Sequence, residues 1–247
     1  MRRFYAPPER FTGGRVRLGD EEAHHICRVL RLGPGDKIHV FDGLGHEYLV
    51  EIEIAAGRVV SGRVLAEVPQ EKEAPLSLAL AQGLAKGDKL ELVIQKATEI
   101  GVKEVIPVHT ARSVLKISEG TRRTERWQRI AREASKQCGR TFVPRVESVT
   151  TLEALSARFK EFDAVLIFWE EERARRLRAA LAELAGKGKV RRLLILVGPE
   201  GGFTQEEVDL VVEAGALPVT LGPRILRTET AGLVAASIIL YELGDLG

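Results

Sequence analysis

The chain has 247 residues, of which 45% are hydrophobic and 29% are charged, and its formal net charge is +2. This composition is typical of an ordinary globular protein with one or two domains. The small net charge does not by itself indicate a nucleic-acid binder.

No apolar run approaches the roughly 20 residues that span a bilayer, and the basic amino terminus is not followed by the apolar core of a signal peptide. Cys27 and Cys138 lie far apart and in different expected domains, which argues against a disulfide framework and favours a reducing compartment. We therefore expect a cytoplasmic protein that does not enter the membrane.

The amino-terminal residues predict a small β-rich domain, in the form of a barrel. Asp20 is expected to cap a short helix. Strands are expected at residues 37–41, 46–54 and 58–68, with a hairpin turn at 42–45. A polar segment bracketed by prolines follows, so we expect one domain at residues 1–70, a linker at 71–73 and a second domain at 74–247.

From residue 76 the pattern changes to strands that alternate with helices, which indicates an α/β domain with a mostly parallel sheet. Strands are expected at residues 76–81, 104–108 and 162–168, and helices at 90–100, 122–138 and 171–184. Thr150 with Glu153 indicates a further helix start. Residues 231–240 are apolar nearly all round, so we expect this helix to be buried, either within the chain or against a second subunit.

The most informative segment is residues 192–231. An unbroken apolar run from Leu193 to Val197 is typical of a parallel strand that is buried on both faces. Gly198, Gly201 and Gly202 follow this strand. Glycines allow backbone conformations that are closed to other residues, and they let a ligand approach the main chain.

The chain then repeats this arrangement. Thr204 and Glu207 form a capping box, which predicts a helix that stops near Gly215. A second strand is expected at residues 217–221, before Gly222, and Thr228 is expected to cap a final helix. Two glycine-bearing loops therefore leave the same end of a parallel sheet, where ligands bind in open α/β folds.

These two loops carry a specific resemblance. The sequences GPEGGF at residues 198–203 and LGPRILRTETA at residues 221–231 resemble the signature of the RsmE family. Members of that family are ribosomal RNA uridine-N3 methyltransferases of the knotted, S-adenosylmethionine-dependent SPOUT superfamily. Similar blocks lie at residues 24–31, 95–102, 112–114, 125–127 and 133–140. Ile100 stands where the family usually has leucine, which is a mild difference.

The resemblance implies a fold and an assembly. It implies a PUA-like RNA-binding domain at the amino terminus and a SPOUT domain whose carboxy-terminal part passes through a trefoil knot. Periodicity alone does not predict the knot, since threaded chains are rare. SPOUT domains usually pair to complete their sites, so the resemblance also implies a homodimer.

The resemblance further implies that the two loops bind S-adenosylmethionine. The expected cofactor-binding residues are Leu196, Val197, Gly198, Glu200, Gly201, Gly202, Leu221, Gly222, Ile225, Leu226, Arg227, Thr230 and Ala231. Gly201→Val is accordingly expected to abolish cofactor binding. The alternative is that these glycines only form tight strand-to-helix turns. Glu200 either lies near the sulfonium or a ribose hydroxyl, or caps a local turn.

Methylation of N3 requires removal of a proton, because neutral N3 of uridine carries a hydrogen. A base or a nearby cation must therefore favour the uridine anion. The candidate catalytic residues are Arg227, Glu229 and Glu133, and the sequence does not identify which of them is the base. Alternatively, Arg227 and Glu229 form an ion pair with each other or with another loop, and Glu133 belongs to a solvated helix face.

RNA binding requires cations for phosphates and flat groups for unpaired bases. The expected RNA-binding residues are Arg2, Arg3, Arg10, Arg15, Arg17, His24, Arg28, Arg31, Arg112, Arg126, Gln137 and Arg140. Each basic run could equally be a solvated face. No metal site is expected, because adjacent His24 and His25 on a helix point about 100° apart.

The leading interpretation is a methyltransferase that acts on N3 of one uridine in small-subunit (16S) ribosomal RNA, either free or in the assembled subunit. A second interpretation is a methyltransferase with the same chemistry that acts on another RNA, such as transfer RNA. A third is a non-catalytic nucleotide-binding or RNA-binding module, in which the first loop holds phosphate at a helix amino terminus. Against the third, the loop lacks the Lys-Ser/Thr ending of a P-loop and the GxGxxG spacing of a dinucleotide site.

Overall fold

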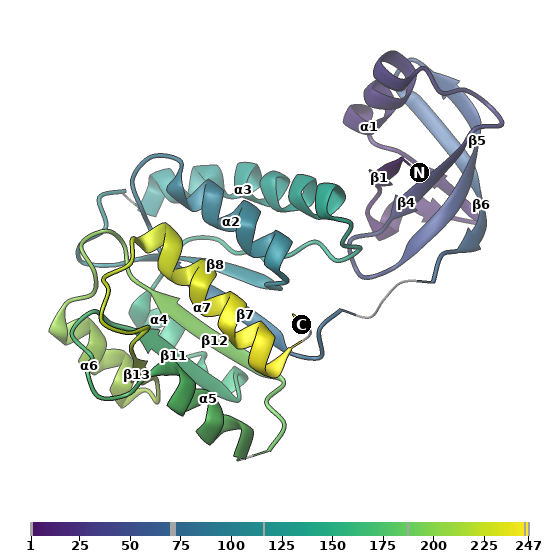
Figure 1. The fold of residues 1–247 in the computed structure, drawn as a ribbon. Coiled ribbons are helices and arrows are strands. Elements are labelled where there is room, and N and C mark those ends of the chain that lie inside the picture. Colours follow the sequence, from purple (N-terminus) through teal and green to yellow (C-terminus); the bar gives the residue numbers. More distant parts are fainter. Residues whose placement is uncertain (1, 70–72, 116, 187, 245, 247) are drawn as a thin grey trace. The chain divides into compact units, whose positions relative to one another are not determined.

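A computed structural model describes residues 2–69, 73–115, 117–186, 188–244 and 246 (Figure 1). The chain divides into two compact units. The first comprises Met1–Glu73 and Ser135–Val143, and the second comprises Ala74–Ala134 and Pro144–Gly247. Sequence patterns had assigned residues 135–143 to the larger domain, because a local pattern cannot show which unit a helix end packs against. Residues 71 and 72 of the expected linker lie outside the described residues.

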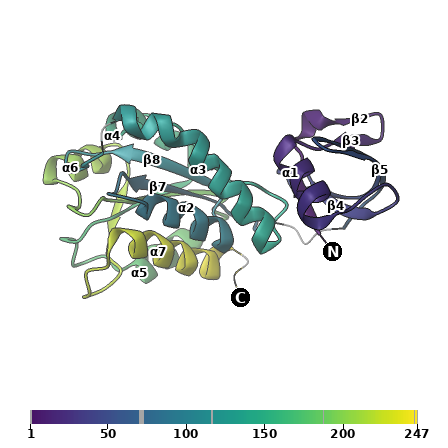
Figure 2. The ribbon, with the colours of Figure 1, turned by 90° about the horizontal axis from the view of Figure 1, so that it is seen from above.

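The first unit contains a curled, six-stranded sheet with the strand order β1-β4-β5-β6-β3-β2 (Figure 2). Its strands are β1 (Arg3–Tyr5), β2 (Phe11–Thr12), β3 (Arg15–Arg17), β4 (Lys37–Phe41), β5 (Glu47–Ala56) and β6 (Val59–Glu67). Its short helices are η1 (Pro8–Arg10), α1 (Asp20–His24) and η2 (His25–Leu30). Phe4, Ile26, Ile38 and Ile52 pack inside the sheet as its core, so the expected β-rich domain is confirmed.

The second unit contains a parallel sheet with the order β10-β8-β7-β12-β11-β13, and β9 also pairs with β8. Its strands are β7 (Ser77–Gly83), β8 (Glu104–His109), β9 (Arg145–Val146), β10 (Thr150–Thr151), β11 (Ala164–Phe168), β12 (Arg192–Val197) and β13 (Leu217–Val219). Its helices are α2 (Lys89–Ile100), α3 (Ile117–Cys138, whose last turn belongs to the first unit), α4 (Leu152–Ser156), η3 (Phe159–Glu161), α5 (Leu177–Gly186), α6 (Gln205–Glu213) and α7 (Thr228–Leu243). The expected α/β domain is confirmed, and the trefoil knot stays a prediction.

Helices cover both faces of the parallel sheet. On one face α2 and α7 pack against each other, and α7 also contacts β7 and β12 (Figures 1 and 2). On the other face Leu194 and Leu196 of β12 pack with residues of α4 and α6 in a buried apolar cluster. Successive side chains of a strand point to opposite faces, so a strand buried on both sides is apolar throughout. This explains why residues 193–197 of β12 are all apolar.

Several expected helix boundaries are confirmed. Thr204 and Glu207 form the capping box at the start of α6. Gly101 ends α2 with a φ of +117°, in the region that glycine adopts most readily. Within the described part of the chain, no helix combines the length and the apolar character needed to cross a membrane.

Other boundaries differ from expectation. Arg227, not Thr228, is the N-cap residue of α7, and Thr228 is the first residue inside that helix. The helix expected from residue 171 begins only at Leu177, because the Glu172 carboxylate accepts hydrogen bonds from the backbone of Ala174 and Arg175 and forms a turn there. Two further caps are shifted by one residue, to Gly19 for α1 and Thr151 for α4.

Candidate active site

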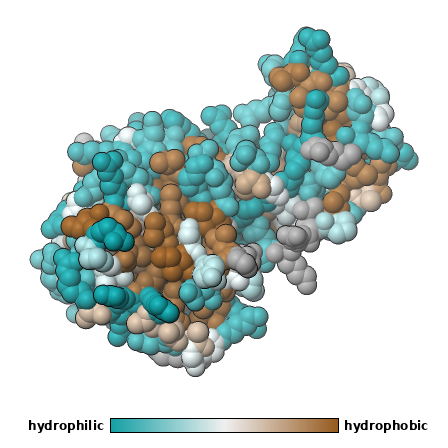
Figure 3. All heavy atoms as spheres, viewed as in Figure 1, coloured by the Kyte–Doolittle hydropathy of each residue, from teal (hydrophilic) through white to brown (hydrophobic). Residues whose placement is uncertain are grey.

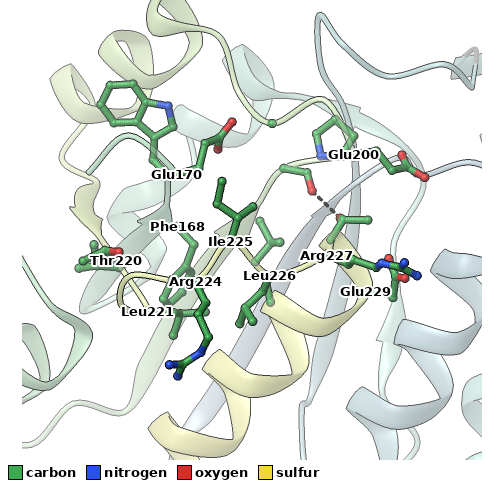
Figure 4. A pocket seen from close by; sticks show the side chains of 18 of the residues that line it. Phe168, Glu170, Glu200, Thr220, Leu221, Arg224, Ile225, Leu226, Arg227 and Glu229 are labelled. Carbon is green, nitrogen blue, oxygen red and sulfur yellow. Dashed lines mark hydrogen bonds between the residues drawn. The ribbon is translucent and has the colours of Figure 1, made fainter. Parts of the chain in front are cut away.

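A cavity of about 500 Å³ lies where β11, β12 and β13 end (Figure 4). Because these strands are parallel, the loops that follow them leave the same edge of the sheet, which is where ligands bind in open α/β folds. Phe168, Leu221 and Leu226 contribute apolar walls, and main-chain atoms of the glycine loops complete the lining.

Most of the expected cofactor-binding residues come together here. The cavity is lined by Val197, Gly198, Glu200, Gly202, Leu221, Gly222, Ile225, Leu226, Arg227 and Ala231, and also by the candidate catalytic residue Glu229. Figure 4 shows Ile225 between Glu170 and Glu200, with Arg227 and Glu229 close together on the Glu200 side.

Four expected residues do not line this cavity. Leu196 is buried in the apolar cluster on the α4 and α6 face of the sheet, because it neighbours Val197 in the strand and points the opposite way. Gly201 faces Arg112 instead, and a Cβ atom there would lie 3.0 Å from the Arg112 Cβ. Thr230 is exposed on α7. Glu133 is exposed on α3, with its carboxylate 4.0 Å from Arg132.

Sequence reasoning missed one wall of the cavity and one residue of α2. Trp169, Glu170 and Arg173 follow β11 and line the cavity, and Lys89 lines it from the start of α2. The sequence did carry a signal for this wall, because β11 was an expected strand and charged residues follow its carboxyl end. What the sequence did not show is that β11 lies between β12 and β13.

The first glycine loop is held by contacts that explain its composition. Gly202 has a φ of +69°, and a Cβ atom at this position would collide with the Glu170 carboxylate. Arg112 Nη1 donates hydrogen bonds to the carbonyl oxygens of Gly201 at 2.7 Å and of Phe203 at 3.3 Å. Arg112, expected to bind RNA, therefore holds the loop in place.

A buried hydrogen-bond network fixes the two loops relative to each other. Thr228 Oγ1 donates to the carbonyl oxygen of Gly198, and Gln82 Nε2 donates to Thr228 Oγ1 at 2.8 Å. The side chain of Gln82, at the end of β7, is thus the central anchor of the site. Buried polar groups of this kind are costly when they lack partners, so the network specifies one arrangement of the loops.

Glu200 connects the first glycine loop to the start of α2. Its carboxylate accepts hydrogen bonds from Lys89 Nζ at 2.8 Å and from the backbone N–H of Lys86 at 3.1 Å. Burial pushes the pKa of Glu200 upward, but these hydrogen bonds outweigh burial and hold the pKa below its usual value. Among the described residues, the ion-pair partner of Glu229 is Lys89 at 3.9 Å, and no ion pair joins Glu229 to Arg227.

Four of the arginines expected to bind RNA form ion pairs within the protein. Arg3 pairs with Glu47 at 2.7 Å, and Arg140 pairs with Glu73 at 2.7 Å, and both guanidinium groups are largely buried. Arg126 pairs with Glu91 at 2.7 Å, and the more exposed Arg15 pairs with Glu53 at 2.9 Å.

The remaining expected RNA-binding residues are exposed to solvent. They are Arg2, Arg10, Arg17, His24, Arg28, Arg31 and Gln137. Arg28 lies in the π-helix η2, and Arg31 follows it in a left-handed conformation with a φ of +55°. In the described ranges, no cluster of three or more His, Cys, Asp or Glu residues could hold a metal ion.

Comparisons with known proteins agree with this geometry. Residues 72–240 match a family model described as an RNA methyltransferase domain, and residues 18–60 match an RNA methyltransferase PUA domain. The chain is 40% identical over 225 residues to ribosomal RNA small subunit methyltransferase E of Bacillus subtilis (strain 168), with 90% of this chain and 88% of the relative covered.

Two solved structures of similar proteins contain the methyl donor. One is ribosomal RNA small subunit methyltransferase E from Neisseria gonorrhoeae bound to S-adenosylmethionine, with a TM-score of 0.86, 32% identity and full coverage of both chains, 100% of each. The other is a putative methyltransferase from Legionella pneumophila in complex with the same cofactor, with a TM-score of 0.87, 32% identity and coverage of 99% of this chain and 98% of that one.

Proposed function

Because the chain belongs to the RNA methyltransferase family that includes ribosomal RNA small subunit methyltransferase E, we propose that it methylates N3 of one uridine in small-subunit (16S) ribosomal RNA. S-adenosylmethionine is the proposed methyl donor, and the cytoplasm is the proposed site of action. The observation that carries this proposal is the single cavity that both glycine loops line, at the carboxyl ends of three parallel strands. Similar proteins have S-adenosylmethionine bound in their solved structures.

The residues of the cavity fit this cofactor. A volume of about 500 Å³ lies within the range of small-molecule sites. Apolar walls suit an adenine ring, and the open space at the Cβ position of Gly222 leaves its main-chain groups accessible at close range. The cavity lining contains both charges, and the carboxylates of Glu170, Glu200 and Glu229 are the groups able to face a positive sulfonium. The cationic residues of the lining are Lys89, Arg173, Arg224 and Arg227. When bound, the cofactor supplies a methyl group already activated by that positive charge.

The protein residues must position the uridine and accept its proton. Glu229 lines the cavity at the start of α7 and is the proposed proton acceptor, while Arg227, two residues earlier, stabilises the developing uridine anion. Holding N3 in line with the methyl group contributes on the order of several kcal/mol. Glu133 does not line the cavity described here, so it takes no part in the proposed step within one subunit.

The exposed cations of the first unit are the proposed RNA-binding surface. Arg28 and Arg31 lie at the end of η2 and are exposed, so both guanidinium groups can meet phosphates. Arg3 and Arg140 are committed to Glu47 and Glu73, and we assign them a structural role within this unit.

The proposed assembly is a homodimer that uses α7. This helix is apolar nearly all round, yet Ile238 is 38% exposed and Tyr241 is 69% exposed, and Leu92 of the adjacent α2 is 44% exposed. Figure 3 shows apolar residues gathered on this face. An exposed apolar patch marks an interaction surface in many soluble proteins.

Tyr241→Glu should convert the dimer to a monomer, as measured by analytical ultracentrifugation. A wild-type monomer would contradict the proposal.

The direct test is transfer of labelled methyl groups to small ribosomal subunits that lack this modification. Free ribosomal RNA and transfer RNA serve as parallel substrates, and mass spectrometry of the nucleosides identifies the product. Methyl on N3 of a single uridine in 16S ribosomal RNA is the expected result. Product only in transfer RNA would support the other substrate, and cofactor binding without transfer to any RNA would refute the proposed activity.

A further inference from the structure

Lys89 occupies a position that is unfavourable for its own helix. It is the first residue of α2, where the helix dipole presents partial positive charge and favours anions. Its ammonium group lies 2.8 Å from Glu200 Oε1 and 3.9 Å from Glu229 Oε2. A cation at this helix end therefore costs electrostatic free energy locally, and its two carboxylate neighbours both line the cavity.

Glu229 supplies the second observation. Its side chain is only 16% exposed, and its Oε2 atom is buried without a hydrogen-bond partner among the described residues. A buried carboxylate oxygen without a donor is unusual, because desolvation penalises the charge. Lys89 lies too far from this oxygen for a hydrogen bond, but close enough to stabilise its negative charge. This oxygen is therefore available to accept a hydrogen bond from a ligand.

The contacts of Glu200 explain why Lys89 stays in this place. Glu200 is itself held by the backbone N–H of Lys86, and its short contact with Lys89 fixes the direction of the lysine side chain. Arg227, the residue that precedes α7, also brings a positive charge near Lys89. Lys89 thus connects three segments at the cavity: the start of α2, the first glycine loop and the start of α7.

We propose that Lys89 is a positioning residue for the methyl transfer, which keeps Glu229 Oε2 directed at the hydrogen on N3 of the bound uridine. This inference rests on the proposed function. As the N3–methyl bond forms and the sulfur–methyl bond breaks, the N3 proton passes to Glu229 Oε2. The products are methylated uridine, neutral S-adenosylhomocysteine and a protonated Glu229, which then releases its proton to solvent.

The test compares Lys89→Met with Lys89→Arg, and uses Lys96→Met as a matched control. Lys96 lies on the same helix and pairs with Glu99 at 2.8 Å, away from the cavity, so the control also removes one lysine ion pair from α2. Loss of the ammonium group removes the neighbour that orients Glu229. Lys89→Met should therefore lower kcat by about tenfold, while the KM for RNA changes by less than about twofold.

One readout is independent of turnover. Calorimetry of Lys89→Met should show S-adenosylhomocysteine affinity within about twofold of the wild type. Lys89→Arg, which keeps the positive charge, should restore kcat. Lys96→Met should match the wild type throughout.

The outcomes separate the two proposals. An active wild type with an unchanged kcat in Lys89→Met overturns the role of Lys89 alone, and so does an equal loss of kcat in Lys89→Arg. A loss of S-adenosylhomocysteine affinity of about tenfold or more in Lys89→Met also overturns it, since Lys89 would then serve the cofactor through Glu200. A wild type that transfers no methyl group to any RNA overturns the proposed function, and the role of Lys89 falls with it.

Discussion

The hydroxyl group of Thr228 donates a 2.5 Å hydrogen bond to the carbonyl oxygen of Gly198, which lies 30 residues earlier in the chain. Both atoms are buried, and Gln82 Nε2 reaches the same hydroxyl at 2.8 Å and the same carbonyl at 3.4 Å. One hydroxyl therefore ties the start of α7 to the loop after β12. The shape of the cavity depends on this connection, because residues on both sides of it line the site.

Removal of this hydroxyl should loosen the site. Thr228→Val keeps the side-chain shape but removes the hydroxyl that both buried groups contact, which leaves Gly198 and Gln82 only their long 3.4 Å hydrogen bond to each other. This loss should cost about 1–3 kcal/mol of unfolding free energy. Urea unfolding measures this loss, and calorimetry should show weaker S-adenosylhomocysteine binding. Thr228→Ser retains the hydroxyl and serves as the control. Equal stability of the Val and Ser variants would contradict the role of the network.

A side chain at Gly202 should weaken cofactor binding. Gly202→Ala meets a positive φ of +69°, and its Cβ atom would displace the Glu170 carboxylate that lines the cavity, so cofactor affinity should fall by about tenfold or more. Gly215→Ala is the control, because Gly215 has a φ of +106° but open space around its Cβ position. The control should lose stability without losing S-adenosylhomocysteine affinity.

A second variant identifies the cause of the loss at Gly202. Glu170→Ala combined with Gly202→Ala removes the collision and should recover part of the affinity. No recovery would assign the loss to backbone strain alone. The structure also changes the interpretation of Gly201, where a larger side chain would press on Arg112 and displace the loop indirectly, since Gly201 itself does not line the cavity.

Protein stability should depend on pH through Glu104. Burial, together with a hydrogen bond and charge from Glu147, raises the pKa of Glu104 from 4.5 to about 7, although Arg158 and Arg145 oppose this. A carboxyl group with a raised folded-state pKa contributes stability that is fully present below pH 4.5 and is lost as the pH rises through about 7. The glutamine side chain of Glu104→Gln cannot ionise, so this variant should not show the loss of stability with rising pH.

Thermal unfolding at a series of pH values between about 4.5 and 8 checks the Glu104 prediction. The midpoint of the wild type should decrease relative to that of Glu104→Gln as the pH rises from about 4.5, and the difference should level off above about pH 7. Parallel curves for the two proteins would show that Glu104 titrates alike in the folded and unfolded chains.

RNA affinity should depend on Arg28 and Arg31. The double variant Arg28→Glu, Arg31→Glu should weaken RNA binding and reduce the slope of log affinity against log salt by about two, because two phosphate contacts are lost. S-adenosylhomocysteine affinity should not change. Arg58→Glu with Arg178→Glu has the same effect on net charge at two other exposed positions and is the control. Equal effects of the two pairs would indicate only a general charge effect.

Features that depend on neighbouring residues in the sequence could be predicted from it. The buried strand β12, the glycine loop after it and the capping box of Thr204 and Glu207 each follow from a few adjacent side chains. Both glycine loops lie at one edge of the sheet because parallel strands end there, and this too followed from the strand pattern. Most of the expected cofactor-binding residues therefore line the cavity.

Features that depend on distant partners were decided only by the tertiary structure. Arg3 and Arg140 resemble free cations in the sequence, but their carboxylate partners lie 44 and 67 residues away. Lys89 reaches Glu200 across 111 residues, because α2 packs against α7 and both helices begin at the same cavity. Local patterns specify strands, caps and turns through short-range sterics and hydrogen bonds. Strand order and helix packing decide which charges meet, because they minimise the free energy of the whole chain.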